Sequence, residues 1–169
     1  IKVIFMYYIN YFFLYSIIGH AIESIIYLFC SGHSGFLYGY WTPVYGIGII
    51  IVLIIDKFLK KFKLSRFKYL LLFFLISSIL LTLIEYLGGI LLKSLFNIVL
   101  WNYSNHKFNF GKFISLKMVI IWGISSLLFI VFLKGKSDKI VKKIPRIVSW
   151  ILIILFFIDL LLTIFMKSK

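Results

Sequence analysis

Long apolar runs constrain this chain more than any other feature of its sequence. Runs close to the length of about 20 residues needed to cross a hydrocarbon core predict helices at about 5–30, 69–92, 114–133 and 148–166. Because 63% of the 169 residues are hydrophobic, a soluble domain of this size would leave a large apolar surface in water. We therefore predict one all-α integral membrane domain, residues 1–169, with the lipid bilayer as its main partner.

A fifth, irregular crossing is predicted between the first two long runs. Its uninterrupted apolar part, 44–55, is too short to span, and a helix at about 44–58 gains length only from the residues before it. Those residues are rich in glycine, which interrupts helices, and in aromatic side chains, which favour the membrane interface. We expect a broken or re-entrant segment near residues 39–46; an interfacial aromatic belt with an ordinary turn is the alternative.

The basic residues predict how the five crossings are oriented. Thirteen of them lie at the N-terminus and in the loops 56–68 and 134–147, which share one side, and six lie on the other side. Lys and Arg accumulate in cytoplasmic loops, so we expect the N-terminus inside and the C-terminus outside. The same bias accounts for the net charge of +14, and no nucleic-acid partner is expected.

Three of the five acidic residues, Glu23, Glu85 and Asp159, fall inside predicted helices, while Asp56 and Asp138 belong to cytoplasmic helix ends. An ionisable group at membrane depth is costly unless it is paired or hydrated, so each of the three is a functional candidate. Asp159 has no obvious partner in its own helix. Our hypothesis is that it pairs with His20 or with a lysine of an outer loop.

Two predicted helices carry polar faces of similar spacing. A serine, a second polar residue and a glutamate follow i, i+4, i+7 spacing: Ser16, His20 and Glu23 in the first helix, and Ser78, Thr82 and Glu85 in the third. Such faces pack against protein or water rather than lipid. Glu23 and Glu85 are therefore predicted to face each other near the outer loops, with at least one protonated or bridged by a cation such as His20 or Lys112.

Plainer interpretations of these faces remain open. Glu23 can serve as a protonated contact between helices, and His20 as a packing residue. A metal site from His20, Glu23 and Glu85 is chemically allowed, but His-x-x-Glu is a weak signal, so we expect neither a metal nor a cofactor. The recurring spacing would fit a parallel internal repeat, but we favour coincidence as its explanation.

The outer loop 93–113 is dense in amide, hydroxyl and aromatic groups. Such groups bind polar ligands by hydrogen bonds and stacking, although the same mixture suits a helix that lies flat on the membrane. Together with the polar faces, this loop defines a predicted solute-binding cavity. Its members are Ser16, His20, Glu23, Tyr45, Glu85, Trp101, Asn102, Tyr103, Ser104 and Asn109.

In their order along about residues 8–130, these features resemble a bacterial membrane family, the CmpB-like type IV ABC-transporter permeases. The matching positions are Ser16, Gly19 and Glu23; Gly35-Phe36-Leu37-Tyr38-Gly39 and Pro43-Val44-Tyr45-Gly46; Glu85, Gly88 and Gly89; and Trp101, Tyr103, Ser104, Asn109 and Gly111. The resemblance implies a multi-pass permease subunit of the bacterial plasma membrane for an unidentified small solute. A separate ATPase would dock at the cytoplasmic loops 56–68 and 134–147.

The chain departs from the family pattern in its outer segments. Ser34 and Asn102 stand where the pattern has Arg and Asp, and Tyr40 follows Gly39 in place of Pro. Because both charges are replaced together, we predict that Ser34 and Asn102 form a neutral contact where relatives have an ion pair.

The chain carries no firm catalytic motif, so we do not expect an enzyme. Gly135-Lys136-Ser137 resembles the end of a phosphate-binding loop, but Ile130 stands where that motif requires glycine. A non-transporting accessory or regulatory subunit is the alternative to a permease, and a membrane-embedded enzyme using His20, Glu23 and Glu85 is a third hypothesis. We expect Glu23→Gln and Glu85→Gln to impair function more than Asp159→Asn, because only the two glutamates are predicted to share a cavity with the outer loops.

Overall fold

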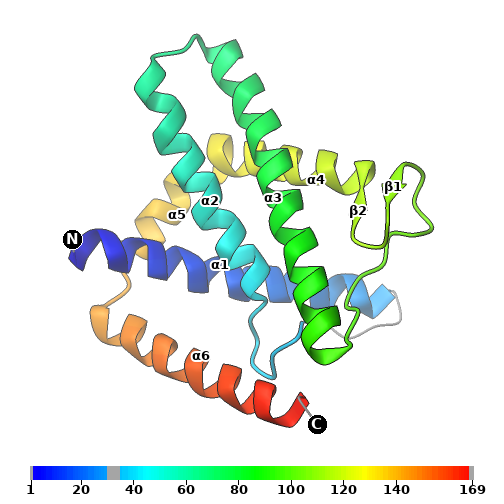
Figure 1. Ribbon diagram of the computed structural model, residues 1–169. Helices are drawn as coiled ribbons and strands as arrows, with labels where there is room; N and C mark the ends of the chain where they lie inside the picture. Colours follow the sequence, from blue (N-terminus) through cyan, green and yellow to red (C-terminus); the bar gives the residue numbers. More distant parts are fainter. Residues whose placement is uncertain (1, 30–34, 168–169) are drawn as a thin grey trace.

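The computed structural model describes residues 2–29 and 35–167, and it is built almost entirely of helices, as predicted (Figure 1). The helices are α1 (Lys2–Phe29), α2 (Pro43–Leu59), α3 (Arg66–Phe96), α4 (Leu116–Leu128), α5 (Lys134–Val141) and α6 (Arg146–Lys167). A 3-10 turn, η1 (Lys60–Phe62), follows α2, and a π-helical segment, η2 (Phe129–Leu133), joins α4 to α5. The short strands β1 (Asn109–Phe110) and β2 (Ile114–Ser115) form an antiparallel hairpin before α4.

Four helical stretches in the described part of the chain are long and apolar enough to cross a membrane, where the sequence predicted five. They are Ile4–Ile26, Arg66–Phe96, Leu116–Val141 and Arg146–Lys167. The remaining long helix, α2, has 17 residues. At 1.5 Å per residue it extends about 25 Å, which is less than the hydrocarbon thickness of about 30 Å. A fifth crossing therefore depends on the residues that precede α2.

Residues 36–42 are not helical, and α2 begins at Pro43. Proline suits the first turn of a helix because its fixed φ is already helical and its missing N–H is not needed there. Thr42 is extended, and its backbone N–H donates to the carbonyl of Ser16 at 3.0 Å, which ties the segment to α1. The predicted interruption is therefore present, but it ends before Gly46, which lies inside α2. Re-entry of this segment into the membrane stays a prediction.

The fourth predicted helix does not end near residue 133. Its helical backbone continues through η2 into α5, so that it runs without a break from Leu116 to Val141. A π-helical turn redirects a helix, and a bend between α4 and α5 is visible in Figure 1. The bend brings α5 to α1, where the Tyr15 and Ser137 hydroxyls lie 2.7 Å apart.

Helices α1 and α2 pack along each other, α3 and α4 do the same, and α2 also packs on α3. Their shared core contains Tyr11 and Phe73, neither of which is exposed, together with Val52 and Phe129. By contrast, most of the large apolar side chains of α6 are exposed, as a lipid-facing helix requires. The polar groups described next lie at the two ends of this core.

Candidate functional site

Glu85 is a buried carboxylate in α3 that joins two other parts of the chain. Its Oε1 accepts a hydrogen bond from the Tyr103 hydroxyl at 2.6 Å, and its Oε2 accepts one from the Trp122 indole N–H at 2.8 Å. Only 5% of Glu85 is exposed. The outer loop and α4 are therefore both held by a single acidic side chain that points into protein.

Glu23 is half-buried in α1 and contacts the beginning of α2 in a comparable way. The Thr42 hydroxyl donates to its Oε2 at 3.4 Å, and the Tyr45 hydroxyl donates to the same carboxylate. Thr42 precedes α2 and Tyr45 lies in its first turn. Glu23 therefore fastens the start of α2 to α1, next to the non-helical segment.

Two aromatic side chains connect these carboxylates. The Tyr45 and Trp122 rings lie 5.7 Å apart between centroids, and each is hydrogen-bonded to one glutamate. Glu23 and Glu85 thus belong to one continuous polar and aromatic cluster. Direct approach of the two carboxylates to each other stays a prediction.

Several buried polar atoms around this cluster lack a hydrogen-bond partner among the described residues. They are Ser16 Oγ, His20 Nδ1, Ser78 Oγ, Thr82 Oγ1 and Trp101 Nε1. Four of the five belong to the two predicted polar faces, and the fifth lies in the outer loop. Since buried polar groups are nearly always hydrogen-bonded, water or a polar solute is the expected partner here.

His20 lies beside the non-helical segment rather than in a ligand cluster. Its ring packs edge-on against Tyr40, with centroids 5.6 Å apart. Across residues 2–29 and 35–167, no group of three His, Cys, Asp or Glu side chains is arranged to hold a metal ion. The alternative metal site of His20, Glu23 and Glu85 is therefore not assembled.

The second outer loop is irregular and is folded by its own side chains. Asn102 Oδ1 accepts from the Ser104 N–H at 3.0 Å and from its hydroxyl at 2.7 Å, and Asn109 donates to the carbonyls of Ser104 and His106. The alternative of a flat surface helix is wrong for this loop, because residues 97–108 are not helical.

The predicted loop residues separate into two groups. Tyr103 and Trp101 turn toward α3, where Tyr103 reaches Glu85 and Trp101 lies over Gly88. Asn102, Ser104 and Asn109 are exposed and stabilise the loop itself. The predicted contact between Asn102 and Ser34 involves a residue outside the described part of the chain. A separate surface hollow between α3 and the β1–β2 hairpin contains none of the predicted site residues; it is lined by Tyr86, Ile90, Lys93, Ser94, Phe110, Gly111, Lys112 and Phe113.

Asp159 of α6 holds the non-helical segment, which corrects both hypotheses about this residue. Its carboxylate accepts from the backbone N–H groups of Tyr38 at 3.2 Å and Gly39 at 2.9 Å, and from the Trp41 indole at 2.6 Å. These partners replace the predicted histidine or lysine. Asp159 thus contacts an outer segment as the glutamates do, so the expected ranking of Asp159→Asn below the glutamate variants loses its basis.

Lys167, the last residue of α6, contacts the same segment. Its ammonium donates to the carbonyl of Phe36 at 2.5 Å and lies over the Phe36 and Tyr38 rings, 4.8 and 5.3 Å from their centroids. Cation–π contacts of this kind stabilise a cation at a membrane interface. Helix α6 therefore anchors the segment at two positions, Asp159 and Lys167.

Residues 10–164 match a family described as "Putative ABC-transporter type IV". The chain belongs to this family. No curated protein and no solved structure matches it. The matched region extends beyond the resemblance of about residues 8–130 and includes α5 and most of α6, so the anchoring helix is part of the family's pattern. The family and the four apolar helices together identify a multi-pass membrane protein of transporter type.

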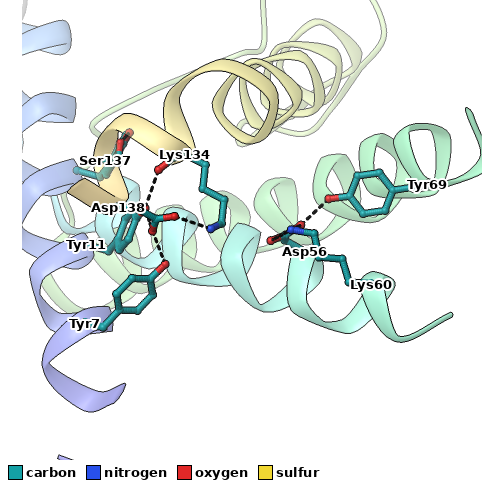
Figure 2. Close-up of polar contacts among 9 residues, drawn as sticks. Tyr7, Tyr11, Asp56, Lys60, Tyr69, Lys134, Ser137 and Asp138 are labelled. Carbon is teal, nitrogen blue, oxygen red and sulfur yellow. Dashed lines mark hydrogen bonds and ion pairs between the residues drawn. The ribbon is translucent and has the colours of Figure 1, made fainter. Parts of the chain in front are cut away.

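The opposite, basic end of this ABC-transporter-type chain carries a polar cluster around Asp138 that the sequence did not predict (Figure 2). The hydroxyls of Tyr7 and Tyr11 each donate to Asp138 Oδ1 at 2.7 Å, and Lys134 donates to Oδ2 at 2.8 Å. The start of α1 is therefore bonded to α5.

A second cluster at the basic end is centred on Asp56 (Figure 2). The Tyr69 hydroxyl donates to Asp56 at 2.6 Å, and Lys60 pairs with the same carboxylate at 2.9 Å. Only 5% of Asp56 is exposed, whereas a charged residue at a cytoplasmic helix end is expected to face water. Both aspartates are bonded to tyrosines from other helices instead of facing water alone.

Two kinds of signal were available for the residues that sequence reasoning missed. Tyr7, Tyr11 and Tyr15 follow i, i+4 spacing, a stripe that marks one helix face. Trp122 precedes Gly123 just as Tyr45 precedes Gly46, and the two aromatics prove to be the partners of the two glutamates.

Proposed function

We propose that this chain is the membrane-spanning permease subunit of an ABC-type transporter for a small polar solute, and that a separate subunit hydrolyses ATP. Membership of the family supports a transport role. One structural observation carries the site: two membrane-depth carboxylates lie among five buried polar atoms without partners in the described residues. Such a cluster is costly in lipid unless it serves a solute or water path.

The solute would bind between the two outer segments. Each segment already donates a hydrogen bond to one carboxylate, Thr42 to Glu23 and Tyr103 to Glu85. Movement of either segment would therefore free carboxylate oxygens on the outer side. The unpartnered hydroxyls of Ser16 and Thr82 supply further hydrogen-bonding groups along the same helix faces.

We propose that α2, extended by residues 35–42, forms a fifth crossing, with the N-terminus inside and the C-terminus outside. The basic loops support this orientation, since Lys and Arg favour the cytoplasmic side. The start of α1 and the end of α5 lie together through the Tyr7–Asp138 bond, as this topology requires. A bacterial plasma membrane is the location that follows from the family resemblance.

The ATPase would dock at the basic loops 56–68 and 134–147. Lys57 and Lys61 at the first loop, and Lys136 and Lys139 at the second, are exposed and are available to an acidic partner surface. The chain itself would perform no ATP hydrolysis and would act only as the channel-forming subunit.

Affinity purification from native membranes in mild detergent tests this proposal. We expect a co-purifying subunit with ATPase activity, and we expect Lys61→Glu together with Lys136→Glu to reduce its recovery. Lys93→Glu, a charge reversal at the outer end of α3, is the matched control and should leave recovery unchanged. A non-ATPase partner would favour the accessory role, and chemical activity of the chain alone would favour the enzyme hypothesis.

A further inference from the structure

The first and third helices repeat the same residues at the same positions. Between α1 and α3, the matching residues are Tyr7 and Tyr69, Phe12 and Phe74, Ser16 and Ser78, and Glu23 and Glu85, and each pair is separated by the same number of residues. Tyr11 and Phe73 also correspond, and both are completely buried. A shared spacing over more than four helical turns is hard to obtain by coincidence when buried positions and polar positions both agree.

The second and fourth helices repeat a second pair of residues, Tyr45-Gly46 and Trp122-Gly123. A Cβ added at Gly46 would collide with Ser16 and Phe12, and one added at Gly123 would collide with Ser78 and Phe74. In both helix pairs, α1 with α2 and α3 with α4, the glycine therefore lies against the corresponding serine and phenylalanine. Equivalent residues make equivalent contacts, which a similarity of sequence alone does not require.

The carboxylates follow the same rule. Glu23 is bonded to the aromatic residue before Gly46, and Glu85 to the aromatic residue before Gly123. These two aromatic residues, Tyr45 and Trp122, also touch each other. In a two-fold arrangement, only residues beside the axis contact their own equivalents, so the axis passes between these rings.

At the basic end, a tyrosine from each half bonds to an aspartate of the other half, although Asp56 lies ten residues after Gly46 and Asp138 fifteen after Gly123. Tyr7 of α1 donates to Asp138 of α5, and Tyr69 of α3 donates to Asp56 of α2. Figure 2 draws the two clusters in one view. A surface hollow is lined by Asp56 of the first half and by Tyr69, Ile130 and Val131 of the second, so it lies along their boundary.

We propose that the chain is a duplicated pair of helices, α1 with α2 and α3 with α4 and its continuation α5, whose halves pack around an approximate two-fold axis between Tyr45 and Trp122, and that the Tyr–Asp bonds between the halves act as latches that hold them together at the basic end. Because both repeats run in the same direction, the axis lies along the membrane normal. Opening of the basic end then requires release of both latches. The inference rests on geometry and extends the proposed transport role without depending on it.

Thiol labelling of the full-length chain in inside-out membrane vesicles tests the latches. In a Cys30→Ser background, Val52→Cys places a reporter thiol in the core shared by the halves, where Val52 is 2% exposed. Removal of one hydrogen bond to a charged group is expected to raise the open population, and hence labelling by a membrane-impermeant maleimide, about tenfold. Tyr69→Phe should therefore have this effect, Tyr7→Phe should have a smaller one because the Tyr11 hydroxyl still donates to Asp138, and their combination should exceed either change alone.

Tyr8→Phe is the matched control, because Tyr8 adjoins Tyr7 but makes no hydrogen bond to either aspartate in the described structure, and labelling should stay at the parent level. Labelling of the Tyr7→Phe, Tyr69→Phe double variant that remains within about twofold of the parent would overturn the latch. If that variant does not fold, thermal unfolding of Tyr45→Trp with Trp122→Tyr decides instead. Equivalence predicts that the double exchange is more stable than the two single changes combined, and strict additivity would refute it. Neither readout measures transport, so failure here is distinct from failure of the proposed function.

Discussion

Replacement of Asp159 by asparagine should release the non-helical segment from α6. The carboxylate accepts two bonds on Oδ2, from Gly39 and Trp41, and two on Oδ1, from Tyr38 and Thr163. Asparagine has the same shape but offers only one acceptor oxygen. In either orientation of the side chain, its amide NH2, which can only donate, would replace one carboxylate oxygen and face the N–H or O–H groups that now donate to that oxygen.

The cost of this change follows from the number of bonds affected. If the amide oxygen keeps Gly39 and Trp41, those bonds lose their charge assistance, and the bond to the Tyr38 N–H is lost. A hydrogen bond to a charged group contributes about 1.5–3 kcal/mol and a neutral one about 1 kcal/mol. We therefore expect the docked segment to lose at least about 2.5 kcal/mol, which corresponds to roughly a 60-fold or larger shift toward the undocked state.

Amide hydrogen exchange in lipid nanodiscs measures this shift directly, because the Tyr38 and Gly39 N–H groups are themselves the donors. Exchange across residues 35–42 should accelerate in Asp159→Asn, up to the rate set by local opening. Leu161→Ala, a change at a lipid-facing position 66% exposed on the same helix, is the control and should leave exchange unaltered. If Tyr38 and Gly39 in Asp159→Asn exchange within about twofold of the parent, the carboxylate does not hold the segment.

Three further predictions concern packing, the outer loop and topology. Gly46→Ala and Gly123→Ala should each destabilise the fold by about 1–3 kcal/mol through overpacking. Gly135→Ala, in α5 with open space around it, should not lower the thermal midpoint and can raise it through helix propensity. Midpoints that are not lowered in Gly46→Ala and Gly123→Ala would contradict the close helix contacts. Tyr103→Phe removes the hydrogen bond to Glu85 and should weaken docking of the loop by about 1.5–3 kcal/mol, so that proteolysis within residues 97–108 becomes faster. A proteolysis rate equal to that of the parent would argue against this bond. A C-terminal reporter that fluoresces only in the cytoplasm should stay dark, and fluorescence would reverse the orientation.

The sequence alone determined that this is a helical membrane protein and which of its residues avoid lipid. Hydropathy and helical periodicity are local properties, so apolar runs identify membrane helices without knowledge of their neighbours. The same reasoning placed Ser16, Ser78 and Glu85 on inward faces, and all three are buried. It also located the helix interruption before α2, because glycine-rich and aromatic residues act on the backbone where they stand.

Only the tertiary structure decided which groups meet. The partners of Glu85, Asp159 and Asp138 come from segments distant in sequence, and their choice depends on the rotation and crossing of whole helices. Helix α5 continues α4 because the π-helical segment redirects the chain without ending it, a change that hydropathy does not register. In the sequence, the two helix pairs are related only by a similar spacing of a few residues. In the structure, Gly46 and Gly123 lie against the corresponding serines, Ser16 and Ser78, which supports their equivalence. Such an equivalence can be recognised only from contacts between helices, because it relates positions in space that are far apart in the sequence.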